Sequence, residues 1–224
     1  MQDGTFVEIE YVGRIKESGE IFDLTDEKLA KEKKIFNPQM KYGPVTLILG
    51  NRQILLGVEK KIKEMKPGEK KAFTLEPKEA FGERNAELTK TFPLSEFHKQ
   101  NMNPQVGQFL RLSNNVEGRV LSVSGGRVRV DFNHPLSGKS LDYELKLNRI
   151  VEKPDEQITK ILEYYTRGAK AVKLDSEKGV ATIELSEDAN MSPAAKKKVS
   201  ESIVKFVKGV KEVSFIESYG AQKS

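Results

Sequence analysis

The amino-terminal third of the chain alternates apolar and polar positions at the spacing of β-strands. Residues 5–13 read TFVEIEYVG and residues 45–49 read VTLIL, so each stretch predicts a strand with an apolar face. Residues 21–23 (IFD) begin another strand after a polar turn at 16–20. The charged stretch 26–34 (DEKLAKEKK) is compatible with a short helix or with a loop.

The spacing becomes helical after the Gly50-Asn51 pair, which ends the strand before it. Pro67-Gly68 then predicts a turn, and residues 72–76 return as a strand. A helix as short as the one between these breaks is unstable alone, so we expect it to lie across a sheet. Four apolar residues mark one face of that helix: Ile54, Leu55, Val58 and Ile62.

Residues 85–130, which we call the insert, carry strand and turn signals of their own. Asn114-Asn115 and Gly125-Gly126 predict hairpin turns, and residues 93–98 predict a turn of helix. Predicted strands lie at 88–92, 109–112, 118–122 and 127–131. Beyond the insert, a closing strand is predicted from the alternation of Leu141, Tyr143, Leu145 and Leu147.

Pro154 marks a boundary, after which the pattern predicts the element order αββαβ. The first helix carries Ile158, Ile161, Leu162 and Tyr165 on its apolar face and ends near Gly168. Ser192-Pro193 is a cap followed by proline at the first helical position. The second helix is striped by Val199, Ile203, Phe206, Val207 and Val210, and the predicted strands are 169–175, 180–185 and 213–216.

The chain is therefore predicted to be an α+β protein of three parts. A discontinuous domain comprises residues 1–84 and 131–153, the insert comprises residues 85–130, and a carboxy-terminal domain comprises residues 154–224. A three-stranded sheet with two helices leaves strand edges open, so we expect that this last domain can pair with a second copy as a homodimer.

The longest recognisable run is LGNRQILLGVEKKIKEMKPGEKKAFTLEPKEAFG at residues 49–82. Together with YVGRIKESGEIFD at 11–23, it resembles the FKBP-type peptidyl-prolyl cis-trans isomerases, in which a short helix lies against a curved antiparallel sheet. An insert followed by FNHPLSGKSL (132–141) resembles the SlyD-like branch, where the inserted domain holds unfolded chains. The carboxy-terminal domain looks like that of long archaeal FKBPs.

The resemblance implies an isomerase that twists Xaa-Pro bonds in unfolded or partly folded polypeptides. No covalent bond changes, although the rotational barrier is about 18–20 kcal/mol. The site therefore needs a dry apolar pocket and neither a cofactor nor a metal. By position, the resemblance assigns catalytic roles to Tyr11, Phe22, Asp23, Leu55, Phe81 and Tyr143, and pocket walls to Val45, Ile54 and Val58.

Within that set, Asp23 is expected to orient the pocket through a hydrogen bond to Tyr11, and the Leu55 N–H to hold a peptide carbonyl. Val58 replaces the family's usual tryptophan and Phe81 its usual flap tyrosine, which puts the binding of macrocyclic inhibitors in doubt. Two alternatives remain. These residues are also compatible with a plain sheet core, and the protein with a holding chaperone or scaffold whose isomerase pocket is vestigial.

The insert is rich in large apolar residues for its length, and a domain this small cannot bury all of them. We therefore expect some to form a surface that binds non-native client chains, while about half fill a small core. Met102, in the segment NMNPQ, suits a surface that adapts to many sequences. The candidates are Phe92, Leu94, Phe97, Met102, Phe109, Leu110 and Val120.

Composition narrows the remaining classes. There are no cysteines, and no apolar run approaches the roughly 20 residues that cross a membrane. The net charge of +5 is mild and no basic stripe stands out, so nucleic acid is not an expected partner, although the insert itself has net positive charge. Without a leader pattern before the first strand, we expect a soluble cytoplasmic protein. Of the two histidines, His98 and His134, we expect the second to support the flap by hydrogen bonding rather than to bind a metal.

Overall fold

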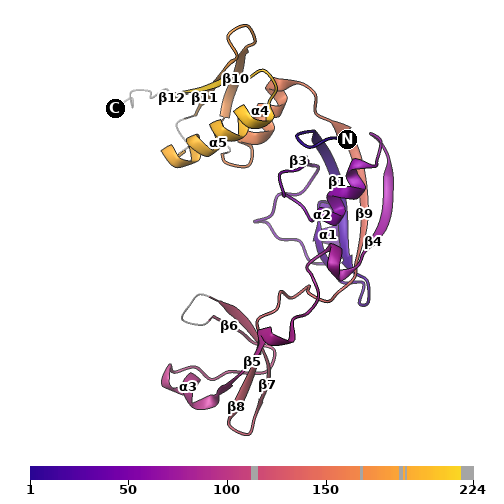
Figure 1. Ribbon diagram of the computed structural model, residues 1–224, viewed down its shortest axis with the longest axis vertical. Coiled ribbons are helices and arrows are strands. Elements are labelled where there is room, and N and C mark those ends of the chain that lie inside the picture. The colour runs from indigo at the N-terminus through magenta and orange to yellow at the C-terminus, as the bar shows by residue number, and fades with distance from the viewer. Residues whose placement is uncertain (112–115, 167–168, 187–188, 190, 218–224) are drawn as a thin grey trace. The chain divides into compact units, whose positions relative to one another are not determined.

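The computed structural model of the chain describes residues 1–111, 116–166, 169–186, 189 and 191–217. They form two compact units. Figure 1 labels the helices and strands. The first unit contains Met1–Val12, Leu24–Ala72 and Glu144–Ser224, and the second contains Gly13–Asp23 and Phe73–Tyr143. The chain is an α+β protein with mainly antiparallel sheets and few helices, as the sequence predicts.

One five-stranded sheet is built from β1 (Phe6–Ile15), β2 (Ile21–Leu24), β3 (Val45–Ile48), β4 (Lys70–Leu75) and β9 (Leu141–Ile150). The strand order is β2-β1-β9-β4, and β3 pairs antiparallel with β1. In that pairing Ile9 lies opposite Val45 and Phe6 lies opposite Ile48. Each strand predicted in this part of the chain is present.

Strand β3 is more buried than its alternation predicts. Thr46, Leu47, Ile48 and Leu49 are all buried, on both sides of the strand. The additional burial has a physical cause, because Ile48 and its partner Phe6 belong to one apolar cluster with residues 151–210 of the carboxy-terminal part. The sequence pattern marks a single apolar face because it does not reveal which segment covers the other.

The predicted short helix is α2 (Leu56–Lys63), with Val58 and Ile62 fully buried. Its carboxylate Glu59 is also buried, and it accepts a hydrogen bond from the Gly50 amide at 2.9 Å while pairing with Lys63. Those contacts compensate a charge that would otherwise be costly to bury. They also fix the helix to the turn that ends β3.

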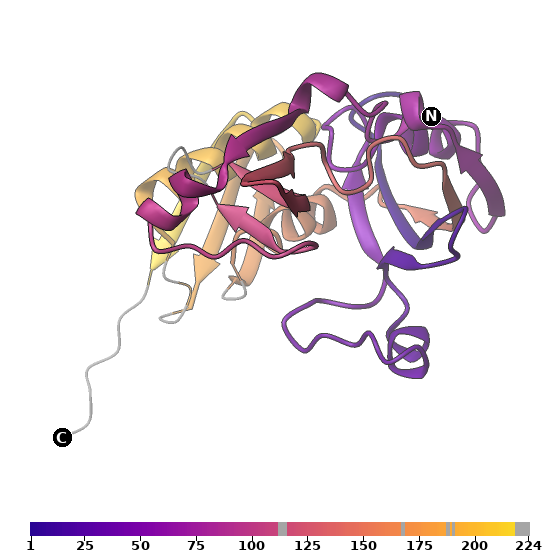
Figure 2. The same ribbon diagram turned by 90° about the horizontal axis from the view of Figure 1, so that it is seen from below.

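The charged stretch after β2 forms a helix, α1 (Glu27–Glu32), rather than a loop throughout. Asp26 caps it by accepting a hydrogen bond from the Leu29 amide at 3.0 Å. A loop follows, in which Phe36 stacks on Tyr42 with ring centroids 5.3 Å apart. Figure 2 shows α1 and this loop projecting from their sheet.

The insert forms its own antiparallel sheet in the order β5-β8-β7-β6. Its elements are the 3-10 turn η2 (Ala86–Leu88), β5 (Thr89–Pro93), α3 (Leu94–Lys99), β6 (Phe109–Arg111), β7 (Glu117–Ser124) and β8 (Arg127–Asp131). Another 3-10 turn, η1 (Pro77–Glu79), precedes the insert. The predicted turn at Gly125-Gly126 is confirmed, because both glycines have positive φ between β7 and β8. The turn predicted at Asn114-Asn115 lies outside the described residues.

The carboxy-terminal elements follow the predicted order: α4 (Pro154–Leu162), β10 (Ala169–Asp175), β11 (Val180–Leu185), α5 (Pro193–Phe206) and β12 (Glu212–Glu217). Strand β11 pairs antiparallel with β10 and parallel with β12. Ser192 caps α5 by accepting a hydrogen bond from the Ala195 amide, as predicted. The prediction for Tyr165 is wrong, because α4 ends at Leu162 and the tyrosine ring is exposed beyond it.

Candidate active site

The first unit holds five of the predicted pocket residues. Tyr11 lies in β1, Val45 begins β3, and Ile54 and Leu55 immediately precede α2; all four are half-buried, so part of each side chain is accessible. Leu55 occupies the position before the helix, where backbone amides have no partner within the helix itself. Val58 has no exposed surface, so it supports the segment from beneath rather than lining a pocket.

In the second unit, an aromatic cluster forms around Tyr143. The Phe22 ring meets the Tyr143 ring edge to face at 5.8 Å, and Phe73 stacks nearly parallel on Tyr143 at the same centroid distance. Sequence analysis assigned Phe22 and Tyr143 but missed Phe73. The signal was available, since Phe73 and Leu75 alternate with polar residues on β4.

Asp23 and the Tyr143 hydroxyl bring polar groups to this cluster. Burial raises the pKa of Tyr143, and the negative charge of Asp23 raises it further. The phenol is therefore neutral at physiological pH and can serve as a hydrogen-bonding group but not as a base. The Phe22, Phe73 and Tyr143 rings supply apolar surface, which matches the environment needed to favour a twisted amide.

Gly13 makes room for the Phe22 ring. A Cβ at this position would lie 2.6 Å from Cζ of Phe22, a distance that forces the ring to move. Gly13 is buried and lies in the middle of β1, where glycine is otherwise unfavourable. Its place in the sequence run YVGRI gave no sign of the ring against it, so sequence analysis missed this residue.

Phe81 is fixed by the segment that follows the insert. Its ring stacks on His134 with centroids 4.3 Å apart, and its carbonyl accepts a hydrogen bond from the Ser137 hydroxyl at 3.1 Å. The Gly138 amide donates to the Gly82 carbonyl at 2.8 Å. His134 Nδ1 accepts from the Leu136 amide, so the hydrogen bonding predicted for this histidine is present.

A polar clasp closes the base of the insert. Asn133 donates to the Asn85 carbonyl at 2.9 Å and accepts from the Asn85 amide at 2.8 Å, and Arg84 pairs with the buried Asp131. Burial alone raises the pKa of Asp131, but hydrogen bonds from Asn133 and the charge of Arg84 outweigh it and lower the pKa. The carboxylate is thus ionised and joins the two crossing chain segments.

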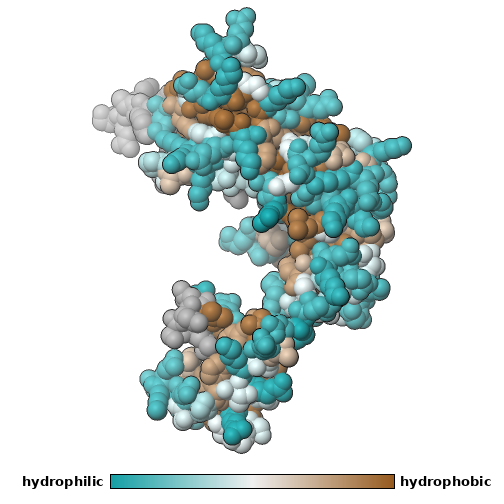
Figure 3. Space-filling view, in the orientation of Figure 1, coloured by the Kyte–Doolittle hydropathy of each residue, from teal (hydrophilic) through white to brown (hydrophobic). Residues whose placement is uncertain are grey.

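The insert divides its apolar residues between a core and a surface. Phe97, Leu110 and Val120 are buried with Val128 and Val130, and part of each predicted client residue Phe92, Leu94 and Met102 packs against that core. Phe109 alone of the predicted set is exposed, at 58%. Figure 3 shows hydrophobic residues at the surface of the insert. Sequence analysis missed four further exposed apolar residues: Leu88, Val106, Val116 and Leu121.

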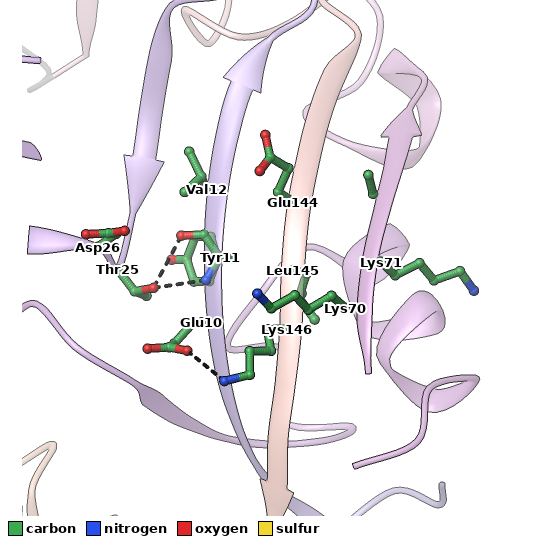
Figure 4. Close-up of a pocket in the computed structure, with 11 residues that line it drawn as sticks. Glu10, Tyr11, Val12, Thr25, Asp26, Lys70, Lys71, Glu144, Leu145 and Lys146 are labelled. Carbon is green, nitrogen blue, oxygen red and sulfur yellow. Dashed lines mark hydrogen bonds and ion pairs between the residues drawn. The ribbon is translucent and has the colours of Figure 1, made fainter. Parts of the chain in front are cut away.

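A shallow hollow of about 360 Å³ lies on the outer face of the five-stranded sheet (Figure 4). Glu10 reaches Lys146 across β1 and β9 there, with Lys70 and Glu144 nearby. Tyr11 contributes its backbone, which bonds the Thr25 hydroxyl, and strand alternation turns its ring to the opposite face. Charges of both signs make this a solvated surface rather than a dry pocket.

In the described part of the chain, no group of three or more histidine, aspartate or glutamate side chains is arranged to hold a metal ion. Over the same residues, no helix combines the length and apolar character needed to cross a membrane.

Comparison with known proteins identifies all three parts of the chain. Residues 1–97 match the FKBP-type peptidyl-prolyl cis-trans isomerase family, residues 90–136 match the FKBP26 IF domain, and residues 154–220 match the FKBP26 C-terminal domain.

Named relatives agree with these matches. The short-type peptidyl-prolyl cis-trans isomerase of Methanocaldococcus jannaschii is 30% identical over 67% of this chain and 94% of its own length. SlyD from Helicobacter pylori is 28% identical over 67% of this chain and 75% of its own. The FKBP-type 16 kDa isomerase of Escherichia coli is 29% identical over 48% of this chain and 74% of its own. The chain therefore belongs to the FKBP-type peptidyl-prolyl cis-trans isomerases.

Proposed function

We propose that this enzyme isomerises Xaa-Pro bonds in non-native polypeptides, which it also holds through its insert. The observation that supports the catalytic part most directly is the aromatic cluster of Phe22, Phe73 and Tyr143 beside Asp23. A proline ring is apolar and fits against aromatic faces. We retain Tyr11, Val45, Ile54, Leu55 and Phe81 as predicted pocket residues on the strength of the family resemblance.

Such a site catalyses the rotation by favouring the twisted amide over the planar one. A planar amide is strongly dipolar because of its resonance, whereas the twisted amide has lost that resonance and is less dipolar. Removing water from the bond therefore favours the twisted form relative to the planar one. The site supplies apolar walls, and Asp23 and Tyr143 supply the few polar groups that orient the chain.

The holding activity is carried by the exposed apolar side chains of the insert. A weak contact at that surface keeps a client chain near the isomerase site, so each prolyl bond is presented repeatedly at a high effective concentration. Catalysis on unfolded proteins should then exceed catalysis on short peptides. Pairing of two copies through the open edges of the carboxy-terminal sheet remains a prediction.

The test of the catalytic proposal is the cis-to-trans relaxation of a short Phe-Pro peptide. The native protein should accelerate it, and Asp23→Asn, which keeps the shape but loses the charge, should lower kcat/KM by about tenfold or more, equivalent to at least about 1.4 kcal/mol. Glu20→Gln, an exposed carboxylate in the preceding turn, is the matched control and should leave the rate unchanged.

Two results would contradict the proposal. An unchanged rate in Asp23→Asn would show that the Asp23 carboxylate takes no part in catalysis. No acceleration by the native protein would instead favour a holding chaperone with a vestigial pocket, a candidate supported by the complete burial of Val58 and the missing hydroxyl at Phe81.

A further inference from the structure

A groove of about 1120 Å³ in the first unit is not used by the proposed mechanism. Its lining comes from the end of the loop after α1, the start of β3, the last part of α4 with the residues just beyond it, and Ala189. Their side chains include Met40, Val45, Tyr164 and Tyr165. The groove therefore joins the sheet to the carboxy-terminal part of the same unit.

The apolar lining of this groove is unusually accessible. Met40 is 45% exposed, Tyr164 54% and Tyr165 42%. Large apolar side chains gathered in a concave site usually mark a binding surface, because exposing them to water is unfavourable. Tyrosine also offers a hydroxyl beside a large apolar ring, which suits recognition of a peptide.

The groove reaches the outer edge of β3 at its first two residues, Val45 and Thr46. This strand pairs with β1 on one side, and on its other side polar side chains satisfy its backbone. The Tyr164 hydroxyl donates to the Thr46 carbonyl, and the Ile48 amide donates to Gln53 Oε1 at 2.8 Å. A strand edge satisfied by side chains is a place where an extended peptide can add main-chain hydrogen bonds by displacing them.

The few charges of the groove do not dominate its apolar lining. Both lysines that line the groove, Lys41 and Lys160, pair with Glu163, at 3.3 and 3.2 Å. One carboxylate balances only one of the two lysines, so the groove keeps a net charge of +1, and Lys41 is mostly exposed to solvent. A single uncompensated lysine is a weak basis for binding a polyanion, which is held by several cations.

The position of the groove indicates which polypeptide would occupy it. Val45 lines the groove and is also a predicted wall of the prolyl pocket. A polypeptide with its proline against Val45 can therefore continue along β3 past Met40 and the two tyrosines. We propose that the groove is a subsite for an extended, apolar segment of the same client polypeptide whose proline is isomerised, an inference that rests on the proposed function.

The test compares two lengths of substrate. One is a minimal Phe-Pro peptide, and the other extends the same Phe-Pro at either end by about six apolar residues, enough to span roughly 20 Å when extended. With the native protein, one of the two extended peptides should show a KM about tenfold lower than the minimal peptide, or about 1.4 kcal/mol. The value of kcat should be similar for both lengths.

Met40→Ser and Tyr165→Ser should each raise KM for the extended peptide severalfold and leave the minimal peptide unaffected. Ile35→Ser is the matched control, because Ile35 is exposed to a similar degree in the same loop but does not line the groove. A photo-crosslinking phenylalanine in the extended flank should label the segment around Tyr164, which provides a readout independent of the substitutions.

Equal KM values for all peptides, or crosslinks elsewhere, would overturn the subsite. So would a loss that is equal for both lengths, since it would indicate general damage to the enzyme. Failure of the native protein to act on the minimal peptide would refute the proposed function instead. In that case crosslinking of the extended peptide still tests the groove, with labelling near Tyr164 supporting it and labelling elsewhere refuting it.

Discussion

At the scale of single residues, the aromatic cluster depends on the absence of a side chain at Gly13 as much as on its rings. Phe22 lies against the β1 backbone because Gly13 has no side chain. Phe73 then completes the packing around Tyr143. Sequence analysis named the residues that the family motif carries but not these two. A glycine within a strand does not show which ring lies against it, and the alternation that places Phe73 on one face of β4 does not show that this face meets Tyr143.

Gly13→Ala should displace the Phe22 ring and reduce kcat/KM on the minimal peptide by about tenfold, since a misplaced group costs catalysis steeply. Overpacking should also lower stability by about 1–3 kcal/mol, measured as a fall in the denaturation midpoint. Adding Phe22→Leu should restore the midpoint by relieving the clash while activity stays low. Full activity in Gly13→Ala would show that the ring position is unimportant.

At the scale of elements, the local hydrophobic pattern predicted the helices and strands but not the features that depend on tertiary packing. Hydrophobic spacing predicted nearly all strands and helices, including the αββαβ order of the carboxy-terminal part, because each element has one face that must be buried. It placed Tyr165 in a helix that ends earlier, and it missed the second buried face of β3. Both depend on packing between distant segments, which periodicity does not encode.

The polar clasp at the base of the insert predicts a loss of local stability in acid. The pKa of Asp131 is lower in the folded protein than its ordinary value of 3.8, so the unfolded form takes up a proton first as pH falls. The contribution of the carboxylate is therefore complete above about pH 4 and disappears as pH drops through the folded pKa. The protection factors of the β5–β8 amides, which compare each exchange rate with that of an unfolded chain at the same pH, should fall in that window.

Asp131→Asn provides the comparison for this prediction. The amide cannot ionise, so the insert should exchange faster than native at neutral pH and should lack the additional change in acid. The same acid response in Asp131→Asn as in the native protein would assign it to other carboxylates.

At the scale of the whole molecule, holding and catalysis are predicted to be separable. Replacing the exposed Val106 and Phe109 of the insert by serine should leave the minimal peptide unaffected, because neither residue belongs to the predicted pocket. It should slow the proline-limited refolding of a denatured protein severalfold, since client chains would no longer be retained.

Val204→Ser is the control for that experiment, because Val204 is an exposed apolar residue of α5, outside the insert. It should refold clients at the native rate. If the client refolds as fast with the Val106 and Phe109 variant as with the native protein, the exposed surface of the insert does not hold client chains.

The clasp that closes the insert also makes it a natural cassette. Asn85 and Asn133 bond to each other through two hydrogen bonds below 3 Å, so the chain leaves and returns at nearly the same point. A protein engineer could therefore replace everything between them with a tight turn, or with an unrelated domain whose ends are equally close. The isomerase domain would then serve as a scaffold, and the inserted module would determine which client proteins it acts on.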